Sequence, residues 1–263
     1  MKIPSPTPVS RIVLLGASNL TISLPIVIET ARRLCGRPSR FLIAAGHGRS
    51  YGVYSRVLFR GLPGVIQSGL WDDLARSPGV RTFALLTDLG NDIGYEQPPE
   101  RLMEWVNWCL DRLAECDARI IVTALPIPSL EHLSPSRYRF FRSLLFPGLS
   151  LPWEEALARA RTADQAVREL CGGRDVAFIE QRPEWYGTDP VHIRRRYRPE
   201  AYLEILKPWL EPGCEVPPVV KSEFRERWRL RLLRPQYQCL FGLEQHRNQP
   251  CGALPDGSTV SLY

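Results

Sequence analysis

The strongest constraint on the fold is the pattern of hydrophobic residues along the chain. Short apolar runs without polar alternation are separated by longer amphipathic stretches. Such runs are typical of strands in a parallel sheet, because helices cover both faces of that sheet. The expected strands are residues 12–15, 41–45, 82–87, 119–125 and 175–180, and the expected helices are residues 21–34, 99–115, 135–145, 152–170 and 200–210. The alternation predicts a doubly wound α/β fold with a parallel sheet of about five strands.

Composition excludes several classes of protein. Of 263 residues, 44% are hydrophobic and 24% are charged, so the chain is neither disordered nor fibrous. No stretch approaches the roughly 18 apolar residues of a membrane-spanning helix, and the first apolar run is too short for a signal peptide. The seven cysteines form no Cys-x-x-Cys pair, so neither a zinc site nor a thioredoxin-like motif is indicated. Scattered single cysteines favour reduced thiols, and we expect a soluble, cytoplasmic protein.

Polar residues follow the ends of several expected strands. The first, second and third strands are followed by Ser18, Gly46 and Asn91, and the loop after the last strand carries Asp189 and His192. Ligands of parallel α/β sheets bind at the carboxyl ends of the strands, so we expect these residues to converge on one edge. A serine, a glycine N–H, an asparagine and an aspartate–histidine pair are the parts of an acyl-transfer site.

These blocks, in this order, resemble those of the SGNH (GDSL-type) hydrolases, which are named after a Ser, a Gly, an Asn and a His. The resemblance implies a flavodoxin-like three-layer α/β/α sandwich that hydrolyses an ester or thioester with neither metal nor cofactor. It implies Ser18 as the nucleophile, His192 as its base and Asp189 as the residue that orients the imidazole. The implied oxyanion hole consists of the backbone N–H groups of Ser18 and Gly46 and the side-chain amide of Asn91.

Two positions depart from the family pattern. Ala17 stands where the family usually has an aspartate that supports the nucleophile turn, and Leu89 stands where a glycine usually precedes the asparagine by two positions. These departures favour an alternative hypothesis, a catalytically silent domain that binds an acylated ligand or a protein partner. Gly48 and Gly52 compete with Gly46 for the donor role.

The last part of the chain extends beyond the resemblance, which covers about residues 10–210. We therefore expect an SGNH-hydrolase-like domain over residues 1–210 and a C-terminal extension over residues 211–263. Residues 221–234 hold six basic and two acidic side chains and predict a basic amphipathic helix. One interpretation packs this helix on the domain, and the others have it contact anionic lipid headgroups or an acidic protein.

The substrate is less constrained than the chemistry. Arg194, Arg195 and Arg196 lie beside the histidine loop and are candidates for contacting an anionic group of the substrate. The aromatic segment 126–152 is interpreted either as a wall of an acyl pocket or as a helix that covers the sheet. The formal net charge of +6 is no nucleic-acid signature, so a nucleic-acid partner is the least favoured. The acyl and leaving groups stay open.

Overall fold

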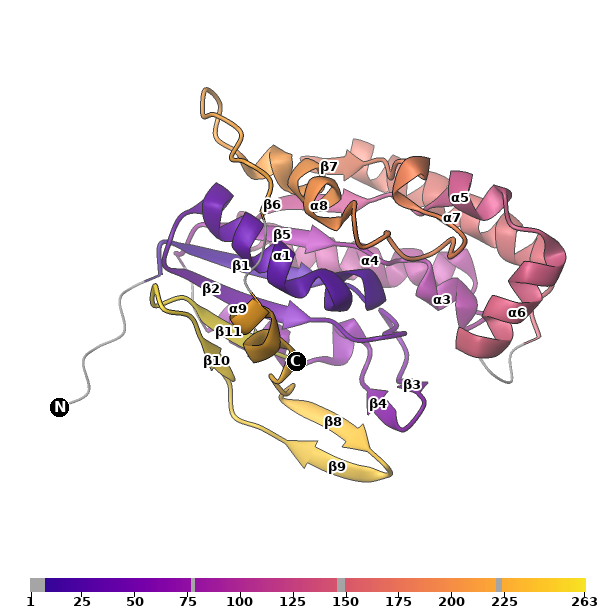
Figure 1. The fold of residues 1–263 in the computed structure, drawn as a ribbon, viewed down its shortest axis with the longest axis horizontal. Coiled ribbons are helices and arrows are strands. Elements are labelled where there is room, and N and C mark those ends of the chain that lie inside the picture. Colours follow the sequence, from indigo (N-terminus) through magenta and orange to yellow (C-terminus); the bar gives the residue numbers. More distant parts are fainter. Residues whose placement is uncertain (1–7, 77–78, 146–149, 221–223) are drawn as a thin grey trace.

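A computed structural model describes residues 8–76, 79–145, 150–220 and 224–263 of the chain (Figure 1). Among these residues the main sheet has seven strands in the order β10-β11-β2-β1-β5-β6-β7. Every neighbouring pair runs parallel except β10 and β11. The strands are β1 (Ser10–Leu15), β2 (Ser39–Ala44), β5 (Thr82–Leu86), β6 (Arg119–Thr123), β7 (Val176–Ile179), β10 (Gly252–Ala253) and β11 (Thr259–Leu262). The predicted α/β sandwich is confirmed, with all five expected strands and two more.

Helices cover both faces of this sheet, which is why its strands are apolar on both sides. On β1, Val13 and Leu15 pack into one core and Ile12 and Leu14 into the other. The first core includes side chains of α2 (Leu70–Ala75), α4 (Pro99–Ala114) and α7 (Trp153–Gly172). The second includes side chains of α1 (Ser18–Cys35), α8 (Arg198–Leu206) and α9 (Phe224–Arg231). The other helices are α3 (Asn91–Gly94), α5 (Ile127–Glu131) and α6 (Pro135–Leu145), with 3-10 turns at Val65–Gln67, Pro183–Trp185 and Lys207–Trp209.

A second, antiparallel sheet was not expected from the sequence. It has the order β3-β4-β8-β9 and joins two hairpins that are far apart in the chain. Its strands are β3 (Ser55–Val57), β4 (Arg60–Leu62), β8 (Tyr237–Leu240) and β9 (Leu243–His246). Strands of three or four residues carry too little periodicity to be recognised, and their pairing is long-range. The hairpins extend from the body of the molecule below the main sheet (Figure 1).

The chain after residue 210 contributes to both sheets. Its strand β11 pairs in parallel with β2, and β10 pairs in antiparallel fashion with β11. Val260 of β11 is fully buried in the core between the sheet and α1. The division at residue 210 stays a prediction; the structure adds that the predicted extension is built into the sheets of the preceding residues.

The predicted basic helix corresponds to α9, although residues 221–223 lie outside the described residues. It contacts α1 and buries Leu230, while Trp228 is 53% exposed. This arrangement favours the interpretation of a helix packed on the domain. In the described part of the chain, no helix is both long enough and apolar enough to cross a membrane.

Candidate active site

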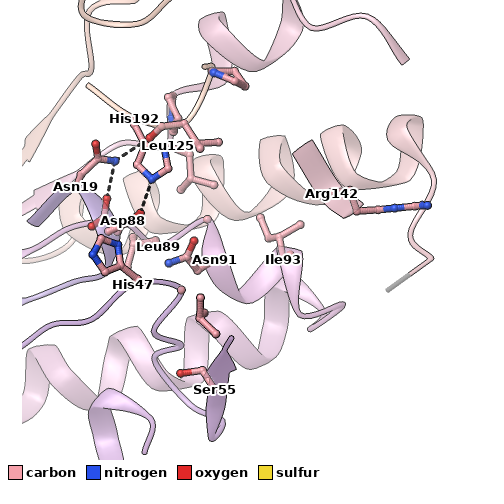
Figure 2. Close-up of a pocket in the computed structure, with 18 of the residues that line it drawn as sticks. Asn19, His47, Ser55, Asp88, Leu89, Asn91, Ile93, Leu125, Arg142 and His192 are labelled. Atoms are coloured by element: carbon pink, nitrogen blue, oxygen red, sulfur yellow. Dashed lines mark hydrogen bonds between the residues drawn. The ribbon is translucent and has the colours of Figure 1, made fainter. Parts of the chain in front are cut away.

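Three side chains form a hydrogen-bonded chain at the carboxyl end of the main sheet. Figure 2 shows the position of its histidine, His192, in the pocket. The Oγ atom of Ser18 lies 2.8 Å from Nε2 of His192. The Nδ1 atom of the same imidazole lies 2.7 Å from Oδ2 of Asp189. The fold therefore brings together a hydroxyl from the start of α1 and an imidazole and a carboxylate from the segment between β7 and α8. Such an arrangement can move a proton from the hydroxyl to the imidazole.

The aspartate is held by its own loop. Its Oδ1 atom accepts the backbone N–H groups of Val191 and His192 at 3.1 and 3.2 Å, which fixes the carboxylate beside the ring. Burial alone would raise the pKa of Asp189. The hydrogen bond and charge of His192, with these two N–H groups, outweigh burial and lower the pKa below its ordinary value. The carboxylate thus stays ionised and can orient the imidazole.

Asp88 supports the turn that carries Ser18, a role that the sequence analysis did not assign. Its Oδ2 atom accepts the N–H groups of Ala17 and Leu20 at 2.8 and 3.2 Å, at the start of α1. Here the supporting carboxylate comes from the loop after β5 rather than from position 17 itself. Because Asp88 directly follows the third expected strand, its place at the same sheet edge was the available signal.

Asn19 joins this turn to the histidine loop and was also missed. Its Nδ2 donates to Oδ1 of Asp88 at 2.9 Å and to the carbonyl of Val191 at 2.7 Å. Its Oδ1 accepts the N–H of Ile193 at 2.8 Å. The amide is therefore hydrogen-bonded to the backbone on both sides of His192. Figure 2 shows Asn19 and Asp88 beside this histidine. These hydrogen bonds join residue 19 to residues 191 and 193, which are far apart in the sequence, so no local motif could have indicated them.

The predicted oxyanion donors are placed differently from one another. Asn91 lines the pocket beside Ser18, and its Nδ2 donates to the carbonyl of Arg49 at 3.3 Å. Gly46 is buried and is not among the residues that line the pocket; a Cβ there would meet Leu62 Cδ1 at 2.3 Å. Gly48 does line the pocket, with a φ of +64° that favours glycine. Packing against Leu62 is enough to explain why residue 46 is a glycine. The donor role of Gly46 stays a prediction.

Asp92 has a structural position next to Asn91. It is fully buried and accepts a short hydrogen bond from Ser50 Oγ and the N–H of Tyr51 at 3.0 Å. Burial raises the pKa of Asp92 to about 6, although the bonds from Ser50 and Tyr51 oppose that shift. The carboxyl group thus ties the loop after β2 to the start of α3 and holds Asn91 in place.

A pocket of about 670 Å³ opens at Ser18 and runs between the sheet edge and the helices α3, α5, α6 and α7. Its wall is mostly apolar. Leu89, at the second departure from the family pattern, is one of the wall residues. Arg142 lies at the far end from His192 (Figure 2), near Tyr138 and Trp153, whose rings lie 5.0 Å apart. Other apolar wall residues are Ile93, Leu125, Leu130, Ala156, Leu157 and Ala160.

The arginines after the histidine loop lie outside the lining of this pocket. Arg194 donates from Nε to the carbonyl of Tyr186, and the guanidinium groups of Arg194 and Arg196 stack over Tyr197 at 5.7 and 4.6 Å. Arg194, Arg195 and Arg196 are all exposed. The cations that line the pocket are instead Arg60 and Arg142. The predicted anionic contact of Arg194–Arg196 therefore gains no support and stays a prediction.

Two further features bear on the chemistry of the site. His47 lines the pocket, where partial desolvation of the ring and then the charges of Arg60 and His192 lower its pKa. Within the described ranges, no three His, Cys, Asp or Glu side chains come together in a way that could hold a metal ion.

Comparison with known proteins identifies the fold. No protein-family model and no curated protein sequence matches the chain. A carbohydrate acetylesterase family member from Sinorhizobium meliloti matches in structure with a TM-score of 0.52 and 12% identity, over 76% of this chain and 96% of that one. A member of the lipolytic G-D-S-L family from Veillonella parvula matches with a TM-score of 0.46 and 10% identity, over 75% and 97% of the two chains. The chain has the fold of the SGNH hydrolases.

Proposed function

We propose that this protein is a serine hydrolase that cleaves an ester or thioester through a covalent acyl-enzyme. The observation that carries the proposal is the chain of two hydrogen bonds, 2.8 and 2.7 Å long, from Ser18 through His192 to Asp189. The SGNH hydrolase fold supports it, because the structural match with the higher TM-score is described as an acetylesterase family member.

Acylation follows from this geometry. His192 Nε2 takes the proton of Ser18 as Oγ attacks the carbonyl carbon, and the carbonyl electrons move to oxygen. Asp189 holds Nδ1–H of the ring and stabilises the imidazolium. When the tetrahedral intermediate collapses, the leaving oxygen or sulfur departs with the proton from His192, and the acyl group stays on Ser18.

The oxyanion is stabilised by the start of α1 and by Asn91. Ser18 is the first residue of an 18-residue helix, so its N–H lies at the positive end of the helix dipole. The Asn91 amide reaches the same end of the pocket. A donor of this kind contributes about 3 kcal/mol to the transition state. Gly48 and Gly46 are the two candidates for a further backbone donor.

Deacylation reverses these roles. A water molecule gives a proton to His192 as its oxygen attacks the acyl carbon, and the same proton returns to Ser18 Oγ as the C–O bond breaks. A carboxylic acid leaves. The acyl group occupies the apolar pocket beyond Ser18, because the wall formed by α3, α5 and α7 offers few polar groups to a hydrophilic chain.

The test is a hydrolysis screen over p-nitrophenyl esters and acyl thioesters of increasing chain length, with Ser18→Ala as the matched variant. We expect turnover that falls by about 10⁴-fold or more in the variant. A Ser18→Ala protein with unchanged turnover refutes the proposal. A folded chain that binds the esters without turnover supports the alternative of a catalytically silent domain.

A further inference from the structure

The small sheet ends in two adjacent turns whose large apolar side chains face solvent. Leu58 and Phe59 form the turn between β3 and β4, and Phe241 lies in the turn between β8 and β9, with Leu243 beside it. Their exposed fractions are 84, 63, 68 and 69%. The rings of Phe59 and Phe241 stack with centroids 4.8 Å apart, and Phe241 N–H donates to the Phe59 carbonyl at 2.8 Å. These four residues are called the turn cluster below.

The backbone of the turn cluster is unfavourable for the residues that occupy it. Leu58 and Phe241 have φ values of +54° and +52°, in the left-handed region that glycine and asparagine tolerate best. Neither side chain recovers this cost by burial, because both are largely exposed. Folding of the chain therefore does not explain a bulky apolar residue at either position, whereas contact with an apolar surface outside the chain does.

The turn cluster lies at the mouth of the pocket. Leu58, Phe59 and Phe241 line the pocket that reaches Ser18 and His192, and they are also exposed to solvent. The outer apolar surface is thus continuous with the inner apolar wall.

The shape and the flanking charges favour a lipid surface over a protein. The four side chains stand on the tips of two turns, while a stable protein interface needs about 800 Å² on each partner. A lipid surface requires only that apolar side chains enter the boundary between headgroups and acyl chains. Arg56 on β3 is exposed, and Arg60 on β4 is half-buried, with its Nε donating to Gln238 Oε1 at 3.0 Å, so two cations lie on the strands next to the first turn. Basic side chains near a lipid surface are attracted to anionic headgroups. The acidic residue next to Leu243 in the chain is Glu244, whose carboxylate accepts a hydrogen bond from the Tyr237 hydroxyl.

We propose that the turn cluster docks on a lipid surface and that the substrate is a lipid ester drawn from it into the pocket. The substrate half of this inference rests on the proposed hydrolase function. The docking half concerns side chains that take no part in the chemistry of Ser18.

The test measures vesicle binding by the full chain in the Ser18→Ala background, so that no lipid is consumed. Phosphatidylcholine vesicles that contain a minor fraction of phosphatidylglycerol are floated with the protein, and the partition coefficient is determined. The variant is L58N/F241N, because asparagine fits the left-handed backbone and keeps the turns intact. The control is W228Q/L232Q, which changes two apolar side chains, 53 and 62% exposed, that lie outside the turn cluster.

We expect L58N/F241N to reduce the partition coefficient about tenfold or more, and the control to change it by less than about twofold. Vesicle binding that is absent in the parent, kept in L58N/F241N or lost equally in the control overturns the docking surface. Self-association that L58N/F241N abolishes, without vesicle binding, assigns the cluster to a second copy of the chain and also overturns it.

Hydrolysis of a soluble p-nitrophenyl ester by the unmodified chain, with Ser18→Ala beside it, separates the two proposals. Ser18-dependent hydrolysis without vesicle binding overturns the docking surface and leaves the proposed function standing. Vesicle binding that depends on the turn cluster, without such hydrolysis, supports the surface and overturns the function.

Discussion

Asn19→Ala removes the side chain that ties the serine turn to the histidine loop. Three hydrogen bonds disappear, to Asp88, Val191 and Ile193, with lengths of 2.9, 2.7 and 2.8 Å. At about 1 kcal/mol each, their loss lowers the free energy of unfolding by about 3 kcal/mol. For a chain of this length that corresponds to a fall in melting temperature of roughly 6–12 °C. The backbone on both sides of His192 also loses its anchor, so the ring moves relative to Ser18.

The kinetic consequence separates a positioning role from a structural one. A displacement of about 1 Å at the imidazole reduces kcat by about 10²-fold. KM changes little, because the apolar wall of the pocket beyond Ser18 keeps all of its side chains. The assay is p-nitrophenyl ester hydrolysis well below the melting temperature of the variant. Asn107→Ala is the matched control, since Asn107 makes side-chain hydrogen bonds on the distant helix α4. If Asn19→Ala loses stability but keeps kcat within about twofold, the positioning argument is refuted.

Three more outcomes are expected. Asp189→Asn lowers kcat about 10³-fold at neutral pH, because the imidazole loses its orienting carboxylate; an unchanged kcat in ester hydrolysis contradicts the role given to Asp189. Ionisation of Asp92 is disfavoured on folding, so its contribution to the free energy of unfolding decreases as pH rises from about 4 to about 6. The free energy of unfolding, measured by urea denaturation, is compared between the wild type and Asp92→Asn. The wild-type free energy minus that of the variant therefore falls by about 2–3 kcal/mol between pH 4 and pH 6. A difference that is flat or rises with pH shows that the burial argument is wrong. Ala156→Phe fills the pocket near Trp153 and shifts the preferred p-nitrophenyl ester to shorter acyl chains, whereas an unchanged chain-length profile excludes this part of the pocket as the acyl site.

The main sheet could be predicted because each of its first five strands is a continuous apolar run. Ile12 and Val13 point to opposite faces, and helices cover both faces, so a strand of this sheet is apolar at consecutive positions. Such a run is recognisable in the sequence. The same logic predicts that Ser18, Asn91 and His192 lie at one sheet edge. The prediction is possible because the carboxyl ends of parallel strands lie at the same edge of the sheet.

The features that escaped prediction all depend on contacts between distant parts of the chain. Strand β4 pairs with β8 across more than half of the sequence, and neither strand has more than four residues. The supporting carboxylate of the serine turn comes from Asp88 instead of position 17, and Asn19 bonds a loop at residues 191–193. No local pattern specifies such pairs. The glycine of the oxyanion block was ambiguous for a related reason, because a Cβ would meet a distant side chain at either position, Leu62 at Gly46 and Val57 at Gly48. What separates the two is that Gly48 lines the pocket and has a φ of +64°.

Covalent labelling of Ser18 is the decisive observation for the proposed chemistry. The full chain is treated with a fluorophosphonate probe, and the modified peptide is identified by mass spectrometry in the unmodified protein, in Ser18→Ala and in His192→Ala. We expect one adduct, on Ser18, absent from Ser18→Ala and formed at least about 10²-fold more slowly in His192→Ala. An adduct on another residue, or a labelling rate on Ser18 that does not depend on His192, contradicts the proposed nucleophile and base.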